Sequence, residues 1–168
     1  GSATNPDTLT ATNGTGTWNI SGLNTGTVLG MTFNDMESLA GGSPNKDTFT
    51  FGTNGRITGS ITGGGSNDDE VVGPADATTG WSASSANAGS ITTTGVISGG
   101  TTNFTNIYTL TGNATTDTLT GPGTGTTWTV SSANAGSVLS MSFTGMDALV
   151  GSATNPDTLT ATNGTGTW

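Results

Sequence analysis

Short runs in which apolar and polar residues alternate follow one another along most of the chain, separated by glycine and asparagine. Leu29–Phe33 and Leu139–Phe143 are two of the clearest. Alternation with a period of two is typical of a strand with one buried face, whereas frequent Gly and Thr disfavour helix. The pattern therefore predicts an all-β protein. We expect Phe33–Leu39, the one stretch with helical spacing, and its counterpart Phe104–Leu110 to be non-helical.

The apolar positions of these runs predict a thin buried column. Threonine and asparagine between them are expected to form ladders of side chains on neighbouring strands. The expected inward set is Leu9, Trp18, Ile20, Leu29, Met31, Phe33, Leu39, Phe49, Phe51, Ile57, Ile61, Val71, Trp81, Ile91, Phe104, Leu110, Leu119, Trp128, Val130, Met141, Phe143 and Leu149.

The sequence repeats itself after 150 residues, because Gly1–Trp18 and Gly151–Trp168 are identical. An identity of this length does not arise by chance. We interpret the chain as a window on a tandem array, in which 1–150 is one full repeat and 151–168 is the start of the next. A single rung of such an array buries too little to fold alone, so stacking of rungs is expected to stabilise the chain.

A shorter period lies inside the repeat. Asp7 precedes Trp18 by the same spacing that separates Asp117 from Trp128. Successive Asp junctions divide the repeat into units 7–46, 47–68, 69–116 and 117–156. If the 22-residue unit is one turn, these lengths predict a parallel β-helix (β-solenoid) with about seven rungs per repeat. At the usual strand spacing, one repeat would then advance roughly 34 Å.

Two further motifs recur after Trp18, Trp81 and Trp128, the first at fixed offsets and the second with an insertion around Thr93–Thr102 in the middle copy. The first is an Asn and Gly pair, and the second is a closing pattern Phe-x-x-(Met/Ile)-x-x-Leu-x-Gly. The pairs are Asn24/Gly26, Asn87/Gly89 and Asn134/Gly136, and the closing patterns begin at Phe33, Phe104 and Phe143.

The amino-acid composition argues against several classes of function. Among 168 residues there are 29 Gly, two Lys or Arg, eleven Asp or Glu, and no Cys or His, which gives a net charge of -9. This excess of acid argues against nucleic-acid binding, because nothing would neutralise phosphates. The missing Cys and His remove disulfides, most zinc sites and the usual general base. No apolar run is long enough for a membrane-spanning helix. Apolar residues at fixed places favour an ordered chain over a disordered one.

The Asp junctions are similar to degenerate calcium-binding nonapeptides. Gly63–Val71 (GGGSNDDEV) is nearest, and it makes Asp68 and Asp69, beside Glu70, the best metal candidates. The favoured alternative is that each Asp caps a turn, with no cofactor. Because consecutive residues on a strand face opposite sides, these acids do not form a catalytic pair, and we expect no enzyme.

The two cations, Lys46 and Arg56, lie close together in sequence, Arg56 in the short unit and Lys46 immediately before it. On an acidic fibre they could make lateral or inter-repeat contacts. The alternative is two solvated side chains that contribute little. The four Trp occupy equivalent places in their units, so we expect them in the core and not as ligand platforms.

With these motifs in place (DTLT…TW, N-(T/A)-G-(T/S)-V-L-x-M-(T/S)-F and F-x-x-M-x-x-L-x-G), the chain resembles repeats of large bacterial surface proteins of the filamentous-haemagglutinin and adhesin type. The resemblance implies a right-handed parallel β-helix, secretion to the cell surface, and a role as stalk, filament or adhesive surface. Our first hypothesis is a structural extracellular filament of stacked copies. The alternatives are an adhesin that binds glycans or another surface, and a calcium-dependent β-roll.

Overall fold

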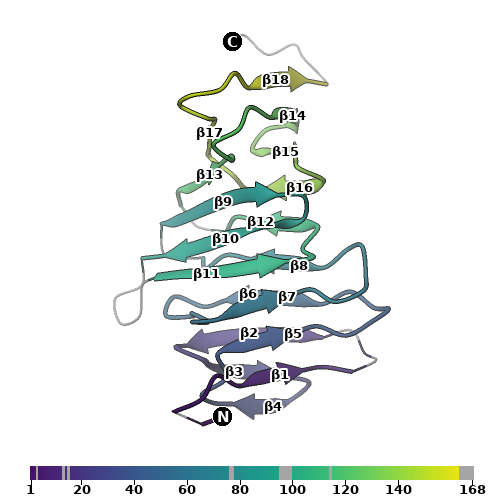
Figure 1. Ribbon diagram of the computed structural model, residues 1–168, viewed down its shortest axis with the longest axis vertical. Coiled ribbons are helices and arrows are strands. Elements are labelled where there is room, and N and C mark those ends of the chain that lie inside the picture. Colours follow the sequence, from purple (N-terminus) through teal and green to yellow (C-terminus); the bar gives the residue numbers. More distant parts are fainter. Residues whose placement is uncertain are drawn as a thin grey trace.

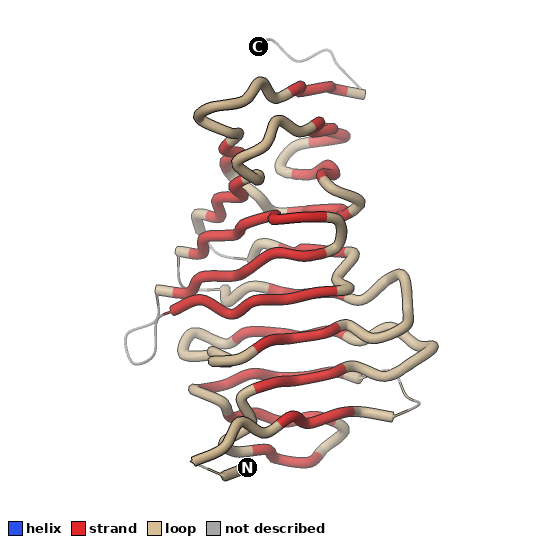
Figure 2. The backbone as a smooth tube through the Cα atoms, in the orientation of Figure 1, coloured by secondary structure: helices blue, strands red, loops and turns tan. Residues whose placement is uncertain are grey.

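The computed structural model describes residues 1–2, 4–12, 14, 16–75, 78–94, 100–113 and 115–162. This part of the chain is all-β and contains no helix, as the sequence predicts. The strands lie across the long axis of an elongated stack, with the N-terminus near one end and the last described strand, β18, near the other (Figures 1 and 2).

The strands form two mixed sheets. The first sheet has eight strands, in the order β1 (Thr8–Thr10), β5 (Ser38–Ala40), β7 (Ser60–Thr62), β11 (Gly100–Thr105), β10 (Ala88–Thr93), β9 (Thr79–Ser85), β13 (Asp117–Thr120) and β17 (Ala148–Val150). The second has ten, in the order β4 (Met31–Phe33), β3 (Thr25–Val28), β2 (Thr17–Gly22), β6 (Thr48–Phe51), β8 (Glu70–Val72), β12 (Thr109–Thr111), β16 (Met141–Thr144), β15 (Ala135–Val138), β14 (Thr127–Ser132) and β18 (Thr158–Ala161).

The chain passes back and forth between the sheets, and most strands that are neighbours across such a passage pair in parallel. Three antiparallel meanders interrupt this pattern: β2–β3–β4, β9–β10–β11 and β14–β15–β16. Each meander turns back along the stack before the chain crosses over (Figure 1). The expectation of purely parallel pairing is therefore corrected, and the sheets are mixed.

The recurring Asn and Gly explain the first hairpin of each meander. Asn24, Asn87 and Asn134 have φ of 54°, 56° and 57°, a left-handed conformation that asparagine tolerates better than most residues. Each closes a two-residue turn between antiparallel strands. This geometry turns the strand back on itself, where a parallel continuation would have needed a crossover.

The Gly of each pair makes room for an aromatic ring. Gly26 lies directly opposite Phe33, and Gly136 lies opposite Phe143. A Cβ on Gly136 would stand 2.7 Å from Phe143 Cζ and would also collide with the Thr129 carbonyl oxygen. The spacing from Asn-x-Gly to Phe is therefore a cross-strand contact, in which the ring covers a backbone without a side chain.

The second turn has positive φ at both central residues wherever it is short. Leu29 and Gly30 have φ of 50° and 77°, and Leu139 and Ser140 have φ of 47° and 64°. Two left-handed residues in a row are the requirement of a type I′ hairpin, whose twist matches that of the strands it joins.

One apolar column fills the space between the sheets, and nearly all of the expected inward residues line it. Trp18, Trp81 and Trp128 are buried, as predicted for core residues, and Trp168 lies outside the described residues. Leu29 and Met31 are exposed, because β4 is the outermost strand of its sheet, and Val130 is half-buried and lies outside the buried cluster. The expected threonine ladders occur in part, for example between Thr92 and Thr101, whose hydroxyls are 2.8 Å apart.

The advance along the stack differs from the sequence estimate. Strands β1 to β17 fill the 150 residues that precede the second copy of the β1 sequence, and two sheets share them. At about 4.8 Å per strand, eight and a half spacings correspond to ~41 Å, compared with the expected 34 Å or so. The meanders account for the difference, because each unit with a meander contains five strands, or two and a half layers, where the estimate allowed about two turns.

The hairpin glycine gives a direct test. We expect Gly136→Ala to lower the free energy of unfolding by about 1–3 kcal/mol, because the added methyl group collides with backbone and with the Phe143 ring. Gly123→Ala is the matched control, since a Cβ there meets nothing within 4 Å. Urea unfolding followed by tryptophan fluorescence would measure both. Equal losses in the two variants would contradict this role of Gly136.

Candidate functional site

The junction aspartates lie inside the protein. Asp47 is fully buried, immediately before β6. Its Oδ1 accepts a hydrogen bond of 3.0 Å from Trp18 Nε1, and its Oδ2 accepts one of 2.9 Å from the Gly42 N–H. One carboxylate therefore holds the tight turn that precedes it and the tryptophan of the neighbouring strand.

The same link recurs along the stack. Trp81 Nε1 donates to Asp117 Oδ1 at 2.9 Å, and Trp128 donates to Asp157. Asp157 also accepts the N–H groups of Thr126 at 2.9 Å and Ser152 at 2.5 Å. A Trp therefore bonds the Asp that opens a later unit and not the Asp that precedes it in its own unit. The turn-capping role favoured for the junction Asp is present at Asp47 and Asp157.

Asp69 occupies an equivalent place before β8 but lacks an indole donor. The residue aligned on the neighbouring strand is Phe49, which has no N–H. Asp69 Oδ1 accepts the Asp47 N–H at 2.7 Å, whereas Oδ2 is buried with no hydrogen-bond partner among the described residues. Asp69 is thus a buried carboxylate in which one oxygen accepts a hydrogen bond and the other accepts none from the described residues.

Burial shifts the pKa of these acids. It raises the pKa of Asp69. The Asp47 N–H and the Ser66 hydroxyl oppose this shift, whereas the negative charges of Asp47 and Asp68 add to it. Burial also raises the pKa of Asp47, although the hydrogen bonds from Trp18 and Gly42 oppose it. The pKa of Asp157, on the exposed end of the stack, is instead lowered by the backbone N–H groups of Thr126 and Ser152.

The candidate metal ligands point to different partners. Asp68 is exposed and accepts a hydrogen bond from the Ser66 hydroxyl, while the neighbouring Asp69 is buried. Glu70 accepts the Thr111 hydroxyl at 2.6 Å and forms an ion pair with Lys46. Within the part of the chain that the structure describes, no three acidic side chains are grouped to hold a metal ion.

Both cations are engaged within the chain. Lys46 Nζ lies 2.8 Å from Glu70 Oε2, which joins two neighbouring rows of the second sheet. The Arg56 main chain bonds Gly22 and Asn24, and its guanidinium lies against Gly100. A contact of either cation with another repeat stays a prediction.

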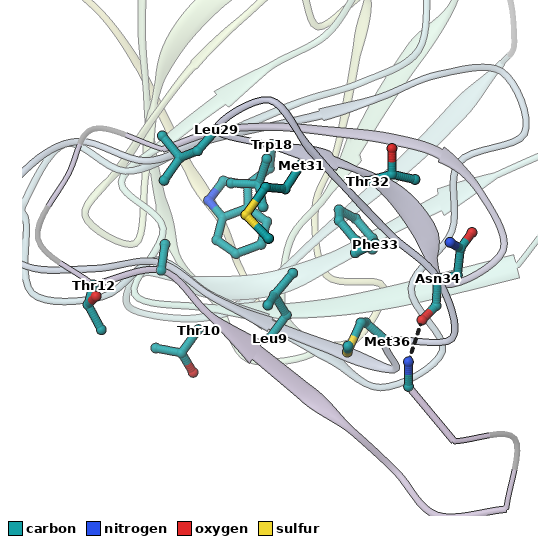
Figure 3. A pocket seen from close by; sticks show the side chains of 13 residues that line it. Leu9, Thr10, Thr12, Trp18, Leu29, Met31, Thr32, Phe33, Asn34 and Met36 are labelled. Carbon is teal, nitrogen blue, oxygen red and sulfur yellow. Dashed lines mark hydrogen bonds between the residues drawn. The ribbon is translucent and has the colours of Figure 1, made fainter.

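The N-terminal end of the stack is open. A cavity of about 470 Å³ lies between the edge strands β1 and β4, and Leu9, Trp18, Phe33 and Met36 line it (Figure 3). Leu29 and Met31 stand at its rim, with 61% and 72% of their surfaces exposed. Exposed apolar side chains beside unpaired strand edges are typical of a surface that another β-structure covers.

An interior copy of the same meander shows the covered state. Met141 occupies in β16 the place that Met31 occupies in β4, yet it is fully buried. The difference lies in the neighbours: β16 pairs with β12 on its outer side, whereas β4 is an edge. The sequence of the meander is therefore suited to a further strand at this position.

At the opposite end, β17 is the outermost described strand of the first sheet and β18 that of the second. Val150 and Leu159 are 44% and 53% exposed there. The two ends thus share the same chemistry, with backbone groups and apolar side chains left open on both sheets.

Sequence reasoning found the residues of these features but not their partners. The near-identical patterns LGM and LSM at Leu29–Met31 and Leu139–Met141 indicate equal environments, and only the strand order distinguishes an edge from an interior strand. The Asp and Trp spacing was visible, but the pair that makes contact lies 29 residues apart at Trp18 and Asp47.

No protein-family model, curated protein or solved structure matches this chain. Among the described residues, there is no helix of the length and apolarity that crossing a membrane requires. The described part of the chain is thus an all-β stack with exposed apolar side chains at both ends.

Removing the charge of Asp69 tests whether this buried carboxylate destabilises the folded protein. Because its folded pKa is raised, the native state binds more protons than the unfolded chain, so stability falls as pH rises from about 4 through that folded pKa. We expect Asp69→Asn to weaken this fall and to raise the unfolding temperature at pH 7. Asp35→Asn, which removes an exposed charge, is the control. Unchanged pH profiles in Asp69→Asn would rule out the buried charge as a source of strain.

The tryptophan link gives a second test. We expect Trp18→Phe to cost about 1–3 kcal/mol, because it leaves buried Asp47 without its indole donor. Trp128→Phe makes the same change beside the more exposed Asp157, which water can reach, and should cost less. Denaturant unfolding of both variants would compare the costs, and an equal loss would show that ring volume and not the hydrogen bond matters.

Proposed function

We propose that the chain is a segment of β-solenoid that serves as a structural rod in an extracellular or cell-surface fibre, built by end-to-end stacking of copies. The observation that carries the proposal is the contrast between Met31 and Met141. The same position is exposed at the end of the stack and buried inside it, so the end has the composition of an interior layer.

The path of the chain supports a solenoid. The chain alternates between two facing sheets around one apolar column. Most strands that are neighbours along the stack pair in parallel. Each layer contacts only its neighbours, so stability grows with the number of layers. The three meanders add antiparallel layers without closing the ends.

The energetics favour stacking. Covering a side chain the size of Leu29 or Met31 contributes about 1.5–3 kcal/mol. Pairing the open edges would also satisfy backbone N–H and C=O groups that otherwise face water. Stacking of copies therefore adds apolar burial and backbone hydrogen bonds at the edge of each sheet.

The acidic residues support a structural role and not catalysis. Asp47 and Asp117 are buried and hold tryptophans of neighbouring strands, and their carboxylates accept N–H donors. A calcium ion is not needed to hold these turns. The cell-surface setting follows from the resemblance of the repeat motifs to those of bacterial surface proteins.

Chains of one, two and four 150-residue units would test the proposal. We expect electron microscopy and small-angle scattering to show rods of constant width that lengthen by ~41 Å per unit, because each unit adds eight and a half strand spacings. The unfolding temperature should rise with the number of units.

The same rods should keep their length and stability in a calcium chelator. Separate beads on flexible joints would contradict the rod. Collapse in the chelator would favour a calcium-dependent β-roll.

A further inference from the structure

We propose that adjacent copies of the 150-residue unit are related by a half-turn about the long axis together with an advance of ~41 Å, so that β17 of one copy pairs with β4 of the next. The surface at the N-terminal end is then a docking site for a second copy. This inference rests on the proposed function, since it specifies how stacked copies meet.

The first observation is that one sequence lies on two different sheets. β1 and β18 contain the same residues, Thr-Leu-Thr, one repeat apart. β1 belongs to the first sheet and β18 to the second. A shift along the axis alone would place both on the same sheet, so the operation between copies exchanges the sheets.

The path of the chain gives the reason. Each passage between meanders contains an even number of single strands, so that successive meanders alternate between the sheets: β2–β4 in the second, β9–β11 in the first and β14–β16 in the second. Because one unit contains three meanders, an odd number, the next meander after the unit lies on the sheet opposite to the one that holds the first. The next copy therefore begins from the opposite sheet, as β18 already does.

The strand pairs expected on both sides of the contact between two copies are already present in this chain. β18 pairs with β14, which places Leu159 opposite Trp128, and β1 pairs with β5, which places Leu9 opposite Leu39. Because 151–162 and 1–12 are the same sequence, superposing them puts one strand between both partners. β13 shows that this arrangement is stable, since it pairs with β9 on one side and β17 on the other.

The remaining contact follows from an interior equivalent. β12 precedes β13 and pairs with the last strand of the next meander, which places Leu110 opposite Phe143. β17 precedes β18, the second copy of β1, as β12 precedes β13. Its partner is therefore β4 of the next copy, with Ala148 opposite Thr32 and Leu149 opposite Phe33.

The chemistry of the open end fits this partner. Leu149 of one copy would close the hollow beside Phe33 of the next, and Trp128 would pack on Leu9. The carboxylate of Asp7 would accept the Trp128 indole N–H, as Asp157, its counterpart, does within the chain. Met31 would then be covered as Met141 is.

A two-copy chain, 1–150 followed by 1–168, tests the register. The sequence has no native cysteine, so Ala148→Cys in the first copy and Thr32→Cys in the second give one defined pair. We expect a short thiol cross-linker to join them. The pair Thr109→Cys and Ser142→Cys, which face each other across β12 and β16, is the positive control. Ala148→Cys with Met31→Cys is the negative control, because adjacent strand positions face opposite sides.

Methionine oxidation provides a second measurement that needs no cysteine. In the single chain Met31 should react quickly and Met141 slowly, given their exposures of 72% and 0%. In the two-copy chain the fast fraction of Met31 should fall to about half, because one copy covers the other. A rod of doubled length with neither cross-link nor protection would overturn the half-turn joint but leave the rod intact. Two unconnected particles would overturn the rod itself.

Discussion

The protein depends on keeping carboxylates inside a core that has few other polar groups. Asp47 stands at the entrance to a strand, where its two oxygens hold a tryptophan from the neighbouring strand and the backbone of the preceding turn. Such a buried acid is tolerated only because N–H donors surround it. Where it occurs, the link fixes the position of one strand relative to its neighbour, which a ladder of backbone hydrogen bonds between short Thr-rich strands specifies weakly. Asp69 shows the limit of this design, since Phe49 offers it no donor.

Much of the fold could be predicted from the sequence, because the alternation of apolar residues directly reports which side of a strand is buried. Trp18, Phe49 and Leu110 are all inward, as their places in the pattern indicate. The direction of pairing could not be obtained in the same way. Asn24 and Gly26 were visible as a recurring pair, but the pattern of apolar residues is the same for a hairpin and for two successive turns of a parallel helix.

The candidate site was less accessible for a related reason. Three meanders turn back along the stack, so order along the chain and order along the axis differ. Trp18 consequently meets Asp47 and not Asp7, and Met31 is at an edge although Met141 is inside. Asp68 and Asp69, adjacent in sequence, have different surroundings because one faces solvent and the other the core. Local motifs identified the residues, and only the strand order identified what they touch.

The meanders also have a consequence for how the chain folds. Residues that pair in β2–β3–β4 are close in sequence, and a hairpin closes within about 1–10 μs. Parallel pairs such as β2 with β6 join residues separated by a whole layer, and such non-local contacts form slowly. Each meander is therefore a local nucleus in a topology that otherwise has none, and neighbouring parallel strands can add to it one at a time. A long chain of these units has nuclei at regular intervals, so folding can start at many points and spread in both directions along the stack.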